Sequence, residues 1–189
     1  SRRRHTRCSR DWSSDVCSSD LEPIRFETMK EIIEAYQANK CDVISSDVSQ
    51  LYAERLGLAK PNENAILADI ISKEPLGPAV RQGDDQWLNL VKWVNYAMIN
   101  AEELGITKAN VAQAKQSQKP AVRRLIGAEG DIGKQLGLSP DWALNIVKNV
   151  GNYGETLEKN VGGKSKLGIA RGLNQLWTMG GIQYAPPLR

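Results

Sequence analysis

Asp47 occupies a position that is typical of a ligand-binding carboxylate. It follows the short apolar run CDVIS at 41–45 and directly precedes a helically spaced run that begins at Val48. A carboxylate between a strand and a helix can cap the helix, which is worth about 1 kcal/mol, or can face a ligand at the carboxyl end of the strand. In the second role Asp47 would accept charge-assisted hydrogen bonds from an ammonium group. One carboxylate can do both, so the two interpretations stay open.

Catalytic and zinc chemistry lack the residues that they need. From residue 22 onward the sequence contains no histidine and a single cysteine, Cys41. This composition excludes His/Cys zinc sites as well as Ser-His-Asp and Cys-His catalysis from that part of the chain. We therefore expect binding without a catalytic group, a metal or a cofactor.

Glycine-rich and acidic motifs have simpler explanations than a phosphate site. The letters GKS at 163–165 imitate the end of a P-loop, but Glu158 occupies the required upstream glycine position and no strand precedes it. The acidic doublets at 84–85 and 102–103 are typical of helix caps or solvated helix faces. Neither feature indicates a nucleotide or metal site.

The segment that carries Asp47 has the pattern of an α/β unit. In chain order we expect a short apolar run at 24–26, a helix at 28–40, a strand at 41–45, a helix at 48–59 and a strand at 65–71. This alternation predicts a parallel sheet with right-handed crossovers. In such sheets ligands bind beyond the carboxyl ends of the strands, where Asp47 would lie.

A long helix follows an extended crossing. Pro75 and Pro78 disfavour helix, and Asp84 or Asp85 can cap the helix that follows. One face of this helix, ending near Gly105, carries Trp87, Val91, Val94, Met98 and Ala101. Such an apolar stripe predicts a buried face, so we interpret the tryptophans as core residues rather than as a ligand platform.

The remaining chain is almost entirely helical in pattern. Ser139 with Pro140 predicts a helix start. One apolar face continues along this helix through Trp142, Ile146, Val150, Tyr153 and Leu157. The final segment, 169–189, predicts a last short helix followed by an extended end. No apolar run reaches the length of a membrane span, and no signal peptide is visible.

Residues 1–21 differ in composition from everything that follows. They contain five arginines and three aspartates, which account for two of the three net positive charges of the chain, so no basic face remains to attract nucleic acid. The string DWSSDVCSSDL resembles a translated sequencing adapter, which indicates a foreign segment that arose as a sequencing artefact. A disordered arginine-rich arm is the alternative. This segment holds His5, Cys8 and Cys17.

Four separated segments resemble one family. CDVISSDVSQLYAERL, IISKEPLGPAVRQGDDQW, VGNYGETLEKNVG and ARGLNQLWTMGGIQYAPPLR are similar to the general L-amino-acid-binding proteins of polar amino-acid ABC transporters, from about Ile24 to Arg189. The resemblance implies an α/β fold of the type II periplasmic-binding-protein class, in which two lobes close around one amino acid. It divides the chain into 1–21 (foreign or disordered), 22–74 (second half of lobe two), 75–104 (return hinge strand and lobe-one helix) and 105–189 (helical C-terminal extension).

The resemblance also implies residue roles. Asp47 matches the lobe-two aspartate that receives the α-ammonium of the ligand, whereas the arginine for the α-carboxylate would belong to an absent N-terminal portion. Arg81 lies on the return crossing and does not take that role. Cys41 would either pair with a cysteine of a neighbouring lobe-two strand or stay a buried free thiol. Ile44, Ser45 and Ser46 stand where relatives commonly carry an aromatic residue or threonine before the aspartate, which leaves the ligand preference open.

The resemblance implies a protein that captures free L-amino acids in the periplasm and delivers them to an ABC permease. It also implies that the complete protein is monomeric and that its signal peptide is lost with the missing N-terminus. Two alternatives remain on the same fold. A dehydratase-like enzyme would need a general acid or base. A ligand-sensing regulatory domain would need an attached DNA-binding module.

Overall fold

The structure is a computed structural model that describes residues 22–73 and 75–188. Its α-helices are α2 (Met29–Gln37), α3 (Val48–Gly57), α4 (Asp85–Glu103), α5 (Pro120–Leu125), α6 (Ile132–Gln135), α7 (Trp142–Val150) and α8 (Tyr153–Asn160). Four single 3₁₀ turns are η1 (Pro61–Glu63), η2 (Gln113–Gln116), η3 (Gly172–Asn174) and η4 (Trp177–Met179). The expectations for residues 1–21, including those for His5, Cys8 and Cys17, lie outside the described residues.

Three of the predicted helices are confirmed, and local capping explains two of their starts. The side chain of Thr28 accepts a hydrogen bond from the backbone N–H of Glu31, whose carboxylate accepts one from the Thr28 backbone in return. This reciprocal capping box starts α2. At α4 the Asp84 carboxylate accepts the Trp87 backbone N–H at 3.0 Å, as the sequence predicts. The third confirmed helix is α3.

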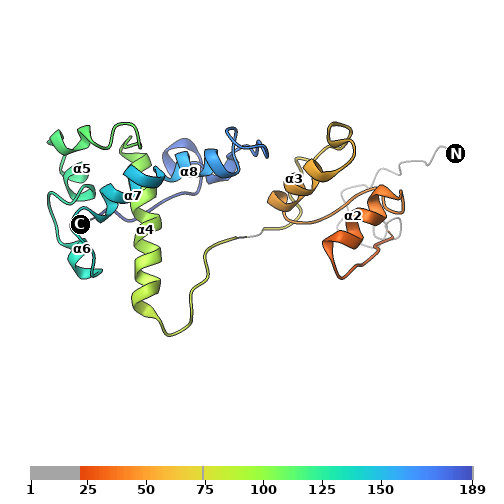
Figure 1. Ribbon diagram of the computed structural model, residues 1–189, viewed down its shortest axis with the longest axis horizontal. Coiled ribbons are helices and arrows are strands. Elements are labelled where there is room, and N and C mark those ends of the chain that lie inside the picture. The colour runs from red at the N-terminus through yellow and green to blue at the C-terminus, as the bar shows by residue number, and fades with distance from the viewer. Residues whose placement is uncertain (1–21, 74, 189) are drawn as a thin grey trace, which may run out of the picture.

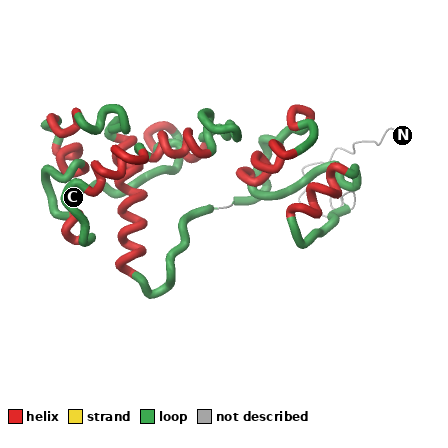
Figure 2. Tube along the Cα trace, viewed as in Figure 1, coloured by secondary structure: helices red, strands yellow, loops and turns green. Residues whose placement is uncertain are grey.

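The predicted strands are wrong for this structure. Residues 41–45 and 65–71 are extended or bent loops, and Figure 2 draws them as loops. Within the described ranges the β-type pairing is a single parallel bridge between Leu176 and Gln183. A strand is defined by its ladder of hydrogen bonds to a neighbour, and neither segment has such a neighbour here. The parallel sheet is therefore not formed among the described residues.

The predicted apolar face at 142–157 is interrupted. Gly151 has φ of 99° and ends α7, and Asn152 then caps a separate helix, α8. A positive φ suits glycine because it has no Cβ, so the helix changes direction at this residue. Downstream, the predicted last short helix is replaced by the turns η3 and η4. Periodicity missed this break, and it placed Val150 on the buried face although that side chain is 54% exposed.

The core lies where α4 packs against α7 and α8. Buried side chains of α4 include Ala97 and Ala101, which join Leu125 of α5 and Val147 of α7 in the main cluster. The first turn of α4 is exposed, and Trp87 is half-exposed, so the prediction that Trp87 belongs to the core is wrong. Trp142 is buried as predicted, and Trp93 packs partly buried against the cluster.

Figure 1 shows two regions of the chain apart from each other. Residues 22–73 carry α2 and α3, and residues 85–188 carry the helices from α4 onward. Residues 75–81, which precede α4, form neither helix nor strand. Among the described residues, no helix is both long enough and apolar enough to cross a membrane.

Candidate functional site

Asp47 occupies the N-cap position of α3, but its side chain makes no capping hydrogen bond in the described structure. Only its backbone carbonyl takes part in the helix, by accepting the Leu51 N–H at 2.9 Å. The plain capping interpretation is therefore not realised. The half-buried carboxylate remains unused by the helix, and the positive end of the helix dipole favours its negative charge there.

A second polar pair accompanies Asp47. The Ser46 hydroxyl donates to the Gln50 side-chain oxygen at 2.9 Å, and both residues are partly buried. Residues 47 and 50 are three apart and so share one face of the helix. The sequence reasoning missed Gln50, although this spacing could have indicated it. The N-terminal end of α3 thus combines the Asp47 carboxylate, which can accept hydrogen bonds, with the Gln50 amide, which can donate them.

Hydrogen bonds join α2 to the loop that follows α3, the helix that begins after Asp47. The Tyr36 hydroxyl of α2 donates to the Asn64 side-chain oxygen at 2.6 Å. The Asn64 amide in turn donates to the Lys60 carbonyl at 2.7 Å, just after α3. Through these bonds α2 is fixed to the loop that follows α3.

The described residues show neither a disulfide at Cys41 nor a group of metal-ligating side chains. Cys41 carries a free, partly exposed thiol, so a disulfide at this residue stays a prediction. The described part of the chain brings no three His, Cys, Asp or Glu side chains together in a group that could hold a metal ion.

A second polar centre joins α4 to the C-terminal segment. Arg171 makes a two-pronged ion pair with Glu102, with one N–O distance of 2.7 Å, and each side chain is 13% exposed. Its guanidinium also lies 5.6 Å from the centre of the Tyr153 ring. The assignment of Glu102 to a solvated face is therefore wrong, whereas Glu103 is exposed as expected. Sequence alone gave no signal for a partner 69 residues away.

Electrostatics at this centre follow from proximity and burial. The Glu102 carboxylate, by hydrogen bonding, raises the pKa of Arg171, which keeps the guanidinium charged. Burial raises the pKa of the Tyr153 hydroxyl. Both side chains of the ion pair are nearly buried and bonded to each other, so we interpret it as a structural latch between α4 and the C-terminal segment.

The junction between α7 and α8 is fixed by Asn152. Its buried side chain donates to the Ile106 carbonyl at 2.9 Å and accepts the Glu155 N–H at 2.9 Å. The Glu155 carboxylate accepts the backbone N–H groups of Asn152 and Lys108 in return, each at 3.0 Å. Nearby, the Gly163 N–H donates to the Glu158 carboxylate at 2.9 Å, which occupies the donor that a P-loop would offer to phosphate.

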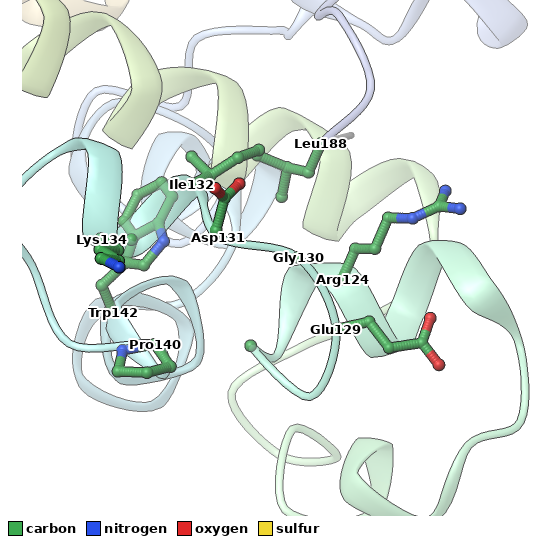
Figure 3. A pocket seen from close by; sticks show the side chains of 11 residues that line it. Arg124, Glu129, Gly130, Asp131, Ile132, Lys134, Pro140, Trp142 and Leu188 are labelled. Atoms are coloured by element: carbon green, nitrogen blue, oxygen red, sulfur yellow. The ribbon is translucent and has the colours of Figure 1, made fainter.

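Two hollows in the described structure do not have Asp47 among their lining residues. One, of about 190 Å³, lies between α5, α6 and α7 and has Trp142 and Leu188 in its lining. In Figure 3 Lys134 lies beside the indole, and the exposed side chains of Arg124 and Glu129 lie on the other side. The other is a shallow depression along residues 81–86. Ligand pockets usually hold about 300 Å³ or more, which the first hollow does not reach, and the second, of about 440 Å³, is open to solvent rather than enclosed.

Comparison with curated proteins gives named relatives. The general L-amino acid-binding periplasmic protein AapJ of Rhizobium johnstonii is 59% identical over 169 residues, which are 88% of this chain and 50% of AapJ. The putative amino-acid ABC transporter-binding protein YhdW of Escherichia coli is 51% identical, over 88% of this chain and 49% of YhdW. The glutamate/glutamine/aspartate/asparagine-binding protein BztA of Rhodobacter capsulatus is 46% identical, over 88% of this chain and 50% of BztA. This chain spans about half the length of these relatives.

Comparison with solved structures agrees. An ABC transporter / periplasmic binding protein from Brucella ovis with glutathione bound superposes with a TM-score of 0.85 at 49% identity, over 92% of this chain and 55% of that chain. No family model matches the chain. At this identity and overlap the described fold is that of part of a periplasmic binding protein. The chain is thus similar, over most of its own length and about half of theirs, to amino-acid-binding periplasmic proteins of ABC transporters.

Proposed function

We propose that the complete protein is an extracytoplasmic solute-binding protein that captures L-amino acids in the periplasm and delivers them to an ABC-type permease. The names of three relatives at 46–59% identity support this function. The observation in the structure that carries it is the Asp47 carboxylate, which stands at the start of α3 without a capping bond. These relatives are named as binding proteins, so they favour neither the dehydratase-like enzyme nor the regulatory domain.

The fold proposed for the complete protein is the two-lobed type II class. Residues 22–74 would be the second half of lobe two, 75–104 the return hinge strand with a lobe-one helix, and 105–189 the C-terminal extension. Exposed apolar side chains in the extended segments, such as Val43, Ile70 and Ile71, support this assignment. Such side chains are typical of strands that pack within a sheet once their neighbours are present.

The proposed role of Asp47 is recognition of the ligand α-ammonium group. A carboxylate that accepts hydrogen bonds from an ammonium forms a charge-assisted contact, and lobe closure strengthens it by excluding water. The amino acids in the name of BztA and the glutathione bound in the Brucella ovis protein share a free α-amino-acid group. Recognition of this shared group would explain how ligands with different side chains are accepted.

The direct experiment uses a chimera in which residues 22–189 replace the matching half of AapJ; we call it the AapJ chimera. Calorimetric titration with a panel of amino acids should show binding, and Asp47→Ala should weaken it by about 30-fold or more, since truncating one partner of a buried charge pair costs about 2–5 kcal/mol. Asp42→Ala changes a nearby exposed carboxylate and should leave the Kd unchanged.

Two results would contradict the proposal. Binding that is equally tight with Asp47→Ala would reduce Asp47 to a residue at the end of a helix. No binding by an AapJ chimera that is folded would argue against the transport function itself. Residues 22–189 alone should bind amino acids weakly or not at all, because the remaining ligand contacts would lie in the other half.

A further inference from the structure

Residues 172–186 form a loop that is closed on itself, here called the C-terminal loop. The Trp177 N–H donates to the Gln183 carbonyl at 3.0 Å, and the Gln183 N–H donates to the Gln175 carbonyl at 3.1 Å. A Cβ on Gly181 would come within 1.9 Å of the Gln175 carbonyl oxygen, so only glycine permits this close approach. These internal bonds and the close approach at Gly181 give the loop one defined turn geometry.

The inner side of the C-terminal loop is attached to α4. Leu176 and Ala185 are buried against Ile99. The Asn100 amide donates to the Pro186 carbonyl at 2.9 Å, and the ion pair of Arg171 with Glu102 holds the start of the loop. The loop is thus fixed at its start, middle and end, so its outer side has a fixed orientation.

The outer side of the C-terminal loop is apolar. Its large apolar side chains are 50% to 68% exposed, and they are Leu173, Trp177, Met179, Ile182 and Tyr184. Two of them, Trp177 and Tyr184, contact each other edge to face with ring centres 5.6 Å apart. No residue from 172 to 188 is charged. An ordered apolar surface without charge is typical of an interface that stays covered, because permanent interfaces are more apolar than transient ones.

The length of the relatives indicates what covers this surface. The fold of this chain is kept, with a TM-score of 0.85, inside a protein of which it spans 55%, and it spans about half of each curated relative. We propose that the outer side of the C-terminal loop packs against an apolar surface in the other half of the same protein. This inference rests on the proposed function, in that both require a complete protein of the relatives' length.

The test compares lysine substitutions in two settings, residues 22–189 alone and the AapJ chimera. Met179→Lys and Ile182→Lys place a charge on exposed side chains, so the Tm of residues 22–189 alone should change by less than about 2 °C. In the AapJ chimera the same charge would be buried without a partner, and we expect the Tm to fall by at least about 5 °C. Val150→Lys, at a similarly exposed residue outside the loop, is the matched control and should change little in either setting.

Four results would overturn the inference. The first is an unchanged Tm of both lysine variants in the AapJ chimera, and the second is an equal fall of the Tm with Val150→Lys. The third is loss of transport by lysine variants that keep the Tm of the chimera. The fourth is a dimer of residues 22–189 that Met179→Lys dissociates. The third would assign the surface to the permease and the fourth to a second copy. Amino-acid titration of the unsubstituted chimera tests the proposed function separately, because absent binding together with the expected fall in Tm would refute the function and keep the interface.

Discussion

Residues 22–73 and 85–188 are both built from helices, yet only the second region encloses a core. Among the described residues every buried apolar side chain except Ala35 lies at or beyond Ala97. In the first region apolar side chains such as Val43 and Ile71 face solvent. The difference teaches that capping and periodicity are enough to form a helix, whereas a core requires an opposing apolar surface within the same chain.

The helices of the first region therefore have little buried apolar surface to stabilise them. Its helices α2 and α3 have nine and ten residues, and isolated helices of that length are marginal in water. The capping box helps α2, and the hydrogen bond from Thr28 lowers the pKa of the Glu31 carboxyl. Both groups lie on an exposed helix end and cannot replace a core.

The sharpest test of this contrast pairs a core truncation with a surface truncation in residues 22–189. Leu125 is 1% exposed within the main cluster, and Ile70 is 71% exposed in the first region. Leu125→Ala should lower the free energy of unfolding by about 2–5 kcal/mol, through lost burial and the cavity that remains. Ile70→Ala should change it by less than about 0.5 kcal/mol. Urea unfolding followed by circular dichroism measures both.

The same two substitutions in the AapJ chimera extend the test. If residues 65–71 become a strand there, Ile70→Ala should become destabilising while Leu125→Ala keeps its effect. A large effect of Ile70→Ala in residues 22–189 alone would break the comparison, since it would show that the first region has a core of its own.

The next largest effect concerns the latch between Glu102 and Arg171 in the second region. Arg171→Met should destabilise residues 22–189 by about 2–3 kcal/mol, because it leaves the nearly buried Glu102 carboxylate without its partner. Replacing both residues by methionine should restore most of that loss, since an apolar pair does not need to be desolvated. Arg171→Lys keeps the charge but loses the two-pronged geometry, so it should lie between these variants.

A double-mutant cycle compares the free energies of unfolding of four proteins: the unsubstituted residues 22–189, Arg171→Met, Glu102→Met and the double methionine variant. If Arg171→Met and Glu102→Met had additive effects, the pair would be a surface contact without coupling, and the C-terminal loop would be held by its apolar side alone. Coupling above about 1 kcal/mol would confirm the latch.

The sequence was informative wherever structure depends on neighbouring residues. The Asp84 cap and the long helix α4 follow from residues three or four positions apart, and α2 and α3 follow from the same periodicity. The strands failed for the opposite reason, because a strand needs a partner that need not be near in sequence. Gly151 broke a predicted helix because its positive φ is invisible to a count of apolar positions.

The candidate site shows the same division. The position of Asp47 before α3 could be predicted from a carboxylate between two patterned segments, and its unused side chain could not. The Ser46 to Gln50 bond is local and was within reach of helical spacing. The pairing of Glu102 with Arg171 spans 69 residues, so it depends on how α4 meets the C-terminal segment and not on any local pattern.

The smallest expected effect is a pH dependence that belongs to the second region alone. Burial raises the pKa of Tyr153 above its ordinary value of 10.0, Arg171 lowers it and Glu102 raises it. The folded state therefore holds this proton more tightly than the unfolded state, so the stabilisation is complete below pH 10 and is lost as the pH rises through the folded-state pKa. Tyr153→Phe should remove this loss, which we expect to stay below about 1 kcal/mol because the ring is only partly buried.

Urea unfolding of both proteins between pH 8 and about pH 11 measures the difference between their free energies of unfolding. This difference should be constant up to the ordinary pKa of tyrosine and then shift in favour of the variant. A difference that stays constant over the whole range would show that the Tyr153 hydroxyl is as well solvated in the folded region as in the unfolded chain.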